Sequence, residues 1–467
     1  MNKLRILALA LVTLGTGACT TLAPDYQRPA APVPAAWAYA PAAESGAAAA
    51  ADIGWRDFLA DERLRRVVEL ALEHNRDLRV AVLNIEQARA QYRIQRADQF
   101  PSLGLTASQN AQRVPGDLNT SGESMVSRQY GVSAGIASWE LDFFGRVRSL
   151  RDAALEQYLA SEEAHRSAHI ALVTEVATAW LQVAADRERL DLARRTLETR
   201  RKAYDLTRAS FEAGAVSALD LHQTRGEMES ARADAAAFES SAARAENALA
   251  LLTGRAVPAE LLPAGLDVAA TRLAELPAGT PADVLVSRPD IVAAEHRLRA
   301  ANANIGAARA AFFPRITLTA STGTASAELG GLFEGGSRAW SFLPQLTLPI
   351  FEAGRLTANL DLAEVRRDIT VAEYERAIQG AFREVADALA ERATLGEQLD
   401  ARRGLQAAAL ESHRLSEARY RAGVDSFLVL LDAQRTLYGA EQELIAARLA
   451  DAANRVTVYK VLGGGWQ

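Results

Sequence analysis

The sequence predicts an α+β membrane protein made of two structural repeats, in which long coiled-coil helices form an α-helical barrel and short strands form a transmembrane β-barrel. The strongest observation is internal repetition. Gly423 lies 209 residues after Gly214, and the same spacing holds without a gap from about residue 139 to 254. The second observation is a run of apolar residues at every seventh position, which is typical of coiled-coil packing. The third is the alternation of apolar with small or polar residues, which indicates strands.

The first residues predict a secretion signal. Residues 6–14 form an apolar stretch that is too short to cross a bilayer. Small residues then precede Cys19, the only cysteine, so no intrachain disulfide can form. The pattern resembles a bacterial lipoprotein signal, with residues 1–18 removed and Cys19 acylated, and Thr20 in place of an aspartate favours sorting to the outer membrane. The alternative is an ordinary signal peptide with an incidental cysteine.

Composition divides the rest of the chain into a tether, two repeats and a linker. Residues 19–52 are rich in Pro and Ala, which predicts an extended, solvated tether. The repeats are expected at 53–254 and 284–467. The Pro- and Gly-rich segment 255–283 separates them as a linker.

The first repeat begins with a helical pattern that ends at Phe100-Pro101, because proline disfavours helix in the residue before it. A strand hairpin is expected at 101–140, where apolar residues alternate with Gly, Ser and Thr. A helix about 100 Å long is then expected from about residue 144 to 213. It turns at Gly214, since glycine adopts left-handed angles freely, and a second helix returns to about residue 253.

The second repeat follows the same plan. A helical pattern ends at Phe313-Pro314, a strand hairpin is expected at 314–350, and Gly354 opens a second long helix. This helix turns near Gly423. The heptad pattern then continues along the returning helix, which predicts a second helical hairpin.

Each chain therefore offers four strands of about ten residues, the length that crosses an outer membrane when tilted. A sheet in lipid cannot leave its edges unpaired, and the smallest closed barrels have eight strands. A trimer would give one barrel of twelve strands, whereas a dimer would give eight strands and a lumen largely filled by side chains. The alternative is a pair of soluble hairpins that pack on the helices.

The helices allow two arrangements. Three chains around one axis can form a helical tube, and the small heptad residues Ala231, Ala440 and Ala447 permit the close approach that a tube wall needs. A solid coiled-coil spacer would show the same heptads.

Several segments resemble outer membrane efflux proteins of the lipoprotein branch, the outer membrane factors of resistance-nodulation-division tripartite pumps. They are TGAC ending at Cys19, WELDFFGRVR from Trp139, the segment that runs from Ser287 to FFPRITL, and RYRAGVDSFLVLLDAQR from Arg419. The resemblance implies a homotrimer with a twelve-stranded β-barrel in the outer membrane, a periplasmic helical barrel and an equatorial collar. Its implied function is a passive, gated exit duct for drugs or other small molecules. The implied partners are a periplasmic adaptor (membrane fusion) protein, an inner-membrane pump and outer-membrane lipid.

The resemblance also assigns roles to the two helical turns. Six tip residues would contact the adaptor: Ala213, Gly214, Ala215, Ala422, Gly423 and Val424. Leu428, Asp432 and Arg435 share one helix face and would form an iris-like gate, in which Asp432 pairs with Arg435 and recurs three times around the axis. An ordinary surface ion pair is the alternative for these two charges. The first repeat lacks charge at the corresponding positions.

Other chemistries have little support. The formal charge of −6 and the lack of a basic block argue against a nucleic-acid partner. No GxxxxGK[ST] loop occurs, and the GVSAG run at residues 131–135 lies within a predicted strand and not at a strand-to-helix turn, so neither NTP hydrolysis nor serine chemistry is indicated. His165 and His169 lie one helical turn apart outside any metalloprotease pattern, so we expect two surface histidines and no metal or other cofactor. Type I protein secretion and a lipid-anchored scaffold without a pore are alternatives to efflux, and an enzyme is the least supported class.

Overall fold

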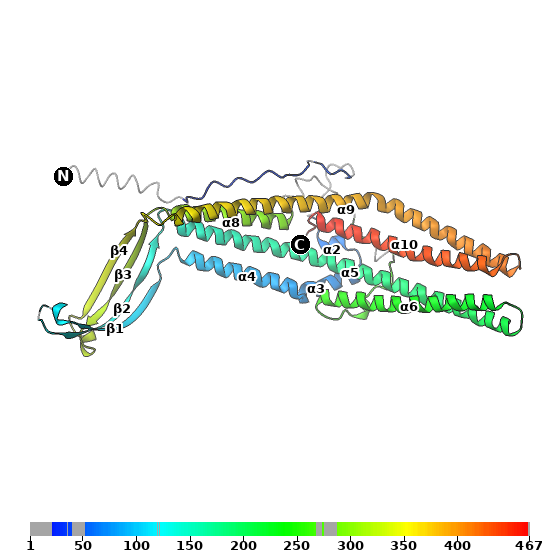
Figure 1. Ribbon diagram of the computed structural model, residues 1–467, viewed down its shortest axis with the longest axis horizontal. Helices are drawn as coiled ribbons and strands as arrows, with labels where there is room; N and C mark the ends of the chain where they lie inside the picture. Colours follow the sequence, from blue (N-terminus) through cyan, green and yellow to red (C-terminus); the bar gives the residue numbers. More distant parts are fainter. Residues whose placement is uncertain are drawn as a thin grey trace. The chain divides into compact units, whose positions relative to one another are not determined.

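A computed structural model describes residues 21–34, 36–39, 52–118, 120, 122–267, 273–274 and 287–465. Cys19 and the signal segment lie outside these residues. The chain forms two compact units (Figure 1). The sheet unit comprises Met1–Ala30, Asn84–Glu162 and Ala293–Tyr374, and the helical unit comprises Ala31–Leu83, Glu163–Val292 and Glu375–Gln467.

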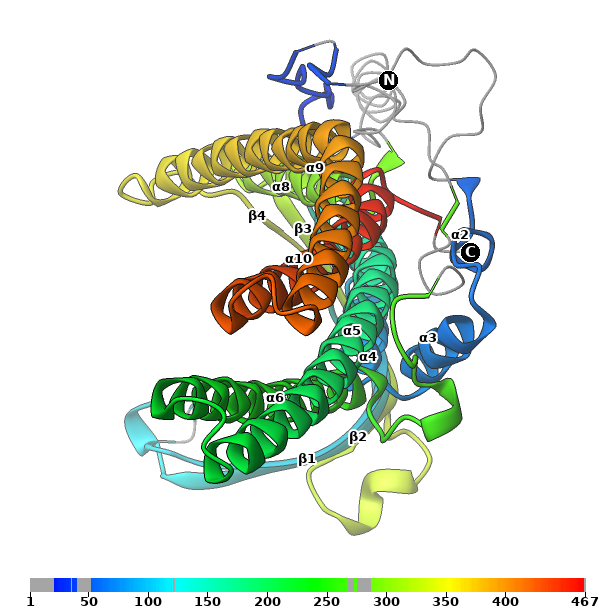
Figure 2. The ribbon, with the colours of Figure 1, turned by 90° about the vertical axis from the view of Figure 1, so that its right-hand side faces the viewer.

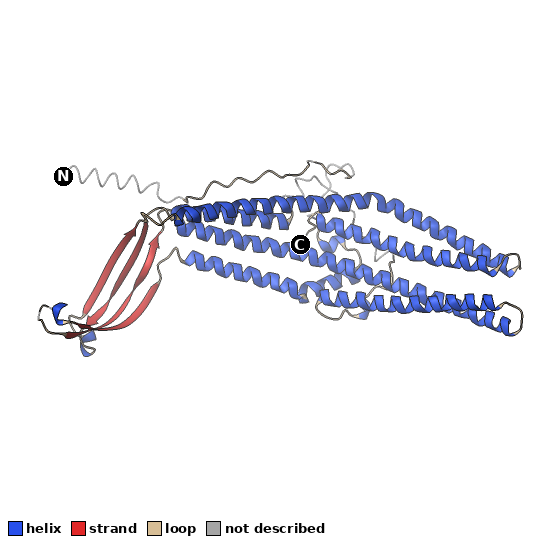
Figure 3. Cartoon of the chain, in the orientation of Figure 1, coloured by secondary structure: helices blue, strands red, loops and turns tan. Residues whose placement is uncertain are grey.

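The sheet unit contains one antiparallel sheet with its four strands in chain order (Figure 3). The strands are β1 (Leu103–Val114), β2 (Met125–Leu141), β3 (Arg315–Ser326) and β4 (Arg338–Thr347). Both predicted hairpins are present, although β2, with 17 residues, is longer than expected. Among the described residues, nothing pairs with the outer edge of β1 or of β4.

One face of this sheet is apolar and exposed. Strand register aligns apolar residues across it, with Leu103 opposite Ile136 and Ile316 opposite Leu346. Large exposed side chains on this face are Leu103, Leu105, Trp340, Phe342 and Leu346. A contiguous apolar patch of this kind is typical of a surface that contacts lipid.

The opposite face is built mainly from small and polar residues, with Leu343 as a large apolar exception. The hydroxyl oxygens of Ser321 and Ser341 lie 2.7 Å apart. At Gly135 an added Cβ would come within 2.3 Å of the Ala320 carbonyl oxygen, so this position accepts no side chain. The alternation read from the sequence therefore separates an apolar face from a small, polar one.

An ion-pair cluster fixes the ends of two strands. The Glu140 carboxylate, near the end of β2, accepts hydrogen bonds from Arg146 at 2.8 and 2.7 Å. The same carboxylate pairs with Nε of Arg315, the first residue of β3, at 2.6 Å. Arg146 begins α5 (Arg146–Glu212). A bidentate pair of this kind sets direction as well as distance, and therefore orients the first turn of α5.

Two long helical hairpins, one from each repeat, form most of the helical unit (Figure 2). α5 and α9 (Arg355–Arg421) have 67 residues each. The returning helices are α6 (Ala218–Thr253) and α10 (Phe427–Val461). The equal lengths confirm the predicted repeat.

Shorter helices precede each hairpin in sequence. They are α2 (Trp55–Phe58), α3 (Glu62–His74), α4 (Arg76–Ala97) and α8 (Pro289–Ala310). Asp61 caps α3, because its carboxylate accepts hydrogen bonds from the Arg63 and Leu64 backbone N–H groups.

The core of the helical unit combines side chains from both ends of the chain. The rings of Phe58 and Tyr459 stack with centroids 4.1 Å apart, and the Tyr459 hydroxyl donates to the carbonyls of Ile53 and Gly465. Trp180 of α5 is fully buried. Among the described residues, α5 alone has a stretch apolar enough to span a membrane, and 61% of that stretch is buried inside the structure. Its hydropathy is that of a core helix.

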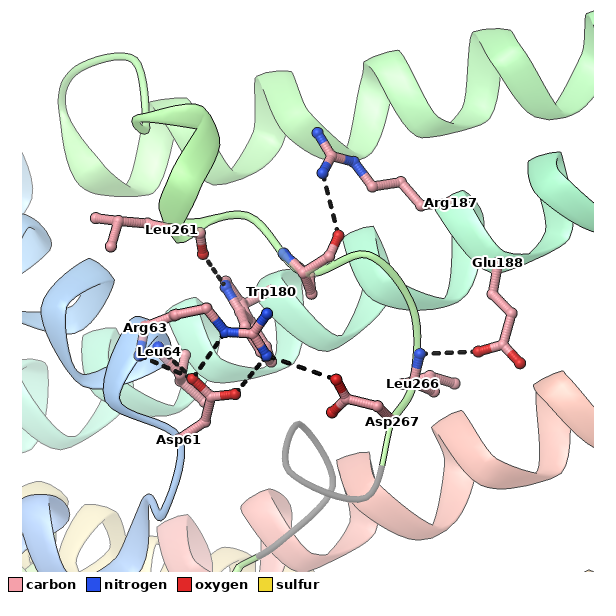
Figure 4. Close-up of polar contacts among 10 residues, drawn as sticks. Asp61, Arg63, Leu64, Trp180, Arg187, Glu188, Leu261, Leu266 and Asp267 are labelled. Atoms are coloured by element: carbon pink, nitrogen blue, oxygen red, sulfur yellow. Dashed lines mark hydrogen bonds and ion pairs between the residues drawn. The ribbon is translucent and has the colours of Figure 1, made fainter.

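The described part of the linker packs against α5 (Figure 4). The Trp180 indole N–H donates to the Leu261 carbonyl at 2.9 Å. The Leu266 N–H donates to the Glu188 carboxylate at 2.8 Å. The linker has the composition of a loop, yet its backbone polar groups form hydrogen bonds with side chains of α5.

The N-terminal segment differs from the prediction. It is extended, as expected, but residues 21–28 are docked on α8 through one side while several of their side chains stay exposed. The Glu295 side chain, only 7% exposed, accepts hydrogen bonds from Tyr26 at 3.2 Å, Arg28 at 3.1 Å and Arg299 at 2.7 Å. Burial raises the pKa of the Glu295 carboxyl, but the hydrogen bonds from the two arginines outweigh burial and hold that pKa below its usual value. The stability that comes from the Arg28 and Arg299 hydrogen bonds to Glu295 is therefore fully present at a pH above the ordinary pKa of glutamate. It is lost as the pH falls through the lowered pKa of the Glu295 carboxyl.

The docked segment runs antiparallel to α8. Beyond Glu295, the Asn302 side chain donates to the Pro24 carbonyl at 2.7 Å. Further along α8, an added Cβ at Gly306 would lie 2.6 Å from the Ala23 nitrogen. Glycine is therefore required at this crossing for the segment to lie against the helix.

We expect Gly306→Ala to displace the docked segment, because the new methyl group would overlap the Ala23 backbone. Amide hydrogen exchange across residues 21–28 should accelerate and the melting temperature should fall. Gly404→Ala in α9 is the matched control, since an added Cβ there meets nothing within 4 Å and should stabilise the helix by about 0.5–1 kcal/mol. Unchanged exchange in Gly306→Ala would contradict this account.

Candidate functional site

Two exposed helical turns occupy the ends of the hairpins. The first contains Ala213, Gly214 and Ala215, and the second contains Ala422, Gly423 and Val424. Gly214 and Gly423 have φ values of 74° and 73°, the left-handed region that favours glycine. The Gly214 N–H donates to the Phe211 carbonyl and the Gly423 N–H to the Tyr420 carbonyl, each at 2.9 Å. The two turns therefore share one backbone design, and their contact with an adaptor stays a prediction.

The three residues expected to form a gate lie near the start of α10. Leu428 and Asp432 are exposed, and the Arg435 side chain is 55% exposed. The Arg435 guanidinium pairs with Glu227 of α6, which the sequence analysis did not identify. The pairing of Arg435 with Asp432 around the axis stays a prediction.

Glu227 lies between two arginines. Its side chain is 9% exposed, and its Oε1 accepts a hydrogen bond from Nε of Arg435 at 2.7 Å and a second contact from the same guanidinium. Arg200 of α5, also buried, lies 2.8 Å from the other carboxylate oxygen. The hydrogen bond to Glu227 raises the pKa of Arg435. We call Arg200, Glu227 and Arg435 the three-helix bridge, because one buried carboxylate joins α5, α6 and α10.

A second row of contacts lies one turn further along α10. The Tyr438 hydroxyl donates to the Asp234 carboxylate of α6 at 3.3 Å. The Arg200 guanidinium lies over the Tyr438 ring, 5.6 Å from its centroid, close enough for a cation–π attraction. α10 is thus held to the first hairpin at two successive levels.

The repeat does not reproduce this bridge. Gly226 and Gln223 stand 209 residues before Arg435 and Asp432, so neither corresponding position in α6 is charged.

A sequence signal for Glu227 and Arg200 was available. Arg200 follows Leu197 by three positions, and Glu227 precedes Ala231 by four, so both charges fall within the apolar heptad stripes. A charged residue in such a stripe indicates a buried pair, because an unpaired charge there would be costly. The partner of each residue cannot be read from one sequence.

His165 and His169 are half-buried on α5. The sequence analysis expected both to lie at the surface, and that expectation is wrong about their burial. Burial lowers the pKa of both imidazoles, with Arg166 adding to the effect at His165. Within the described part of the chain, no three His, Cys, Asp or Glu side chains are grouped as metal ligands would be.

The sequence profile of the outer membrane efflux protein family matches residues 67–255 and 280–464. Two curated relatives match almost end to end. The toluene efflux pump outer membrane protein TtgC of Pseudomonas putida is 50% identical over 464 residues, which cover 99% of this chain and 96% of the relative. Outer membrane protein OprJ of Pseudomonas aeruginosa is 50% identical over 456 residues, 98% of this chain and 95% of the relative.

Solved structures agree with this match. The open state of the Neisseria gonorrhoeae MtrE outer membrane channel has a TM-score of 0.86 and 42% identity, with 96% of this chain and 99% of that chain covered. The Campylobacter jejuni CmeC outer membrane channel has a TM-score of 0.88 and 26% identity, with 96% and 95% covered. The repeat, the four-stranded sheet with one apolar face and the paired helical hairpins therefore identify this chain as a member of the outer membrane efflux protein family.

Proposed function

We propose that this chain is the outer-membrane exit duct of a tripartite efflux pump, which passively conducts exported small molecules. The observation that carries the proposal is the sheet, with one apolar exposed face and two unpaired edges, in a chain of this family. A coiled-coil scaffold without a pore has no use for such a sheet. Relatives named for toluene and antibiotic efflux favour small molecules over secreted proteins as the cargo.

A homotrimer is the assembly that this sheet supports best. In lipid, the unpaired edges of β1 and β4 must find partners, since each unsatisfied backbone group costs several kcal/mol there. Pairing β1 of one copy with β4 of the next closes the sheet, and three copies give twelve strands. The small, polar face then lines an open lumen.

The energy for transport would come from partners. We propose a periplasmic adaptor at the two helical turns and an inner-membrane resistance-nodulation-division pump beyond it. Small residues such as Gly214 and Gly423 at both turns permit close backbone approach by an adaptor. Substrate selection would belong mostly to the pump.

If the cognate pump uses this duct, deleting the gene should sensitise the host to several unrelated toxic compounds. The measurement is growth inhibition across a broad panel, with the wild-type gene restored as a control. Unchanged sensitivity in a strain that still expresses the pump would contradict the efflux function.

Leu428, Asp432 and Arg435 are proposed as the gate, with the three-helix bridge as its latch. The exposed carboxylate of Asp432 would recur three times around the axis and attract cations. Opening requires α10 to move away from α6, which breaks the contact between Arg435 and Glu227. The buried Glu227 keeps Arg200 as a partner, so the latch can open without leaving a buried charge unpaired.

Arg435→Ala should favour the open state. Because Arg435 is half exposed, the lost contact is worth about 1 kcal/mol, which predicts a roughly fivefold rise in the open-to-closed ratio. Single-channel recording in planar bilayers measures this ratio. Arg402→Ala removes the exposed pair with Glu443 between α9 and α10 and is the matched control. Equal open times for the two variants would rule out the latch.

Cys19 is proposed as the lipid-bearing residue. Thr21, two residues later, places its hydroxyl 2.8 Å from that of Ser149, in the first turn of α5. The described segment that follows Cys19 in sequence therefore begins beside the first turn of α5, a few residues after β2 ends at Leu141. Acyl chains on Cys19 would anchor the chain in the outer membrane.

Metabolic labelling with an alkyne-bearing fatty acid should mark the mature protein, and Cys19→Ser should abolish the label. The variant is a clean test because the chain contains one cysteine. Label that persists in Cys19→Ser would show that lipid is attached elsewhere.

A further inference from the structure

The two helical turns have the same backbone but are held by different side chains. In the second turn, the Val424 N–H donates to the Arg419 carbonyl at 3.0 Å, and in the first the Ala215 N–H donates to the Ser210 carbonyl at 2.8 Å. These hydrogen bonds end α9 and α5 in the same way. Any difference in rigidity must therefore come from the side chains around them.

A bidentate ion pair crosses the second turn. Nε of Arg419 donates to one carboxylate oxygen of Asp425 at 2.6 Å, and a terminal guanidinium nitrogen donates to the other at 2.8 Å. The rings of Tyr420 and Phe427 meet across the same turn with centroids 5.6 Å apart. The ion pair and the ring contact thus both tie the end of α9 to the start of α10 across the turn that contains Val424.

Among the residues that the structure describes, no ion pair or ring contact crosses the first turn. Ser210 and Val216 stand at the positions of Arg419 and Asp425, and neither carries a charge. Instead Ser217 and Asp220 form a capping box, in which each side chain bonds the backbone of the other. A capping box ties the first turn of α6 to itself and adds no bond to the end of α5.

We propose that the ion pair between Arg419 and Asp425 pre-forms the second turn for docking and makes it the tighter of two unequal adaptor sites. This inference rests on the adaptor role proposed above. A loop held in its bound conformation loses less entropy on association. Val424 is 62% exposed, and Tyr420 and Leu428 are also exposed. The matching surface on the adaptor is accordingly apolar.

The test measures the affinity of the purified periplasmic adaptor of the host's own pump for the full-length channel in nanodiscs. Asp425→Arg should raise the dissociation constant about tenfold, the cost of ordering one or two side chains on binding. The charge swap Arg419→Asp with Asp425→Arg restores an ion pair and should bring affinity back to within about threefold of wild type. Hydrogen exchange at residues 422–426 should rise in the single variant and fall again in the swap.

Asp220→Asn is the matched control at the first turn. It removes the capping carboxylate without loosening a cross-turn contact, so it should change the dissociation constant by less than about twofold. Equal affinity of wild type and Asp425→Arg, or an equal loss in Asp220→Asn, would overturn the inference and leave the efflux function standing. Failure of the wild-type channel to bind the adaptor would instead overturn the adaptor role itself.

Discussion

Backbone hydrogen bonding in hydrocarbon is the constraint on which the rest of this structure depends. A sheet with an apolar face suited to lipid cannot end in open edges, and this chain builds only four strands. Closure by further copies of the same chain follows from that shortage. The small residues of the opposite face follow as well, because bulky side chains there would fill the lumen that closure creates. The pairing of Glu140 with Arg146 and Arg315 fixes the strand ends in each copy.

Repetition supplies the architecture, and departures from it carry the specific chemistry. Both repeats build a strand hairpin, a helix of 67 residues and a returning helix. Arg435 and the Arg419–Asp425 pair occur in the second repeat only. One hairpin therefore bears the charged contacts that hold it to its neighbour, and the other supplies the receiving carboxylate, Glu227.

Local rules explain why so much of the fold was predictable. Proline at positions 101 and 314 ends a helix, glycine at 214 and 423 turns one, and heptads require long helices. Each of these residues determines the backbone conformation only within a few positions of its own. The placement of the two tips followed from the same rules, whereas the proposed gate role of Leu428, Asp432 and Arg435 came from the family resemblance.

The contacts that escaped prediction join residues far apart in sequence. Tyr26 meets Glu295 across 269 positions, and Arg435 meets Glu227 across 208. A Pro- and Ala-rich composition predicts an extended segment, but it does not reveal that α8 binds this segment. Arg200 and Glu227 were visible as charges in an apolar stripe, yet their pairing with each other and the contact of Glu227 with Arg435 depend on how three helices pack.

The ladder between α5 and α6 limits how the length of the chain can change. Arg187 pairs with Glu246, Arg194 with Glu239 and Arg200 with Glu227, so rungs recur along both helices. Seven residues inserted into α5 alone would slide it by about 10 Å and separate every rung beyond the insertion. Natural length variants of this duct should therefore insert or delete the same number of residues in α5 and in α6, in multiples of a heptad, so that the ion pairs stay in register.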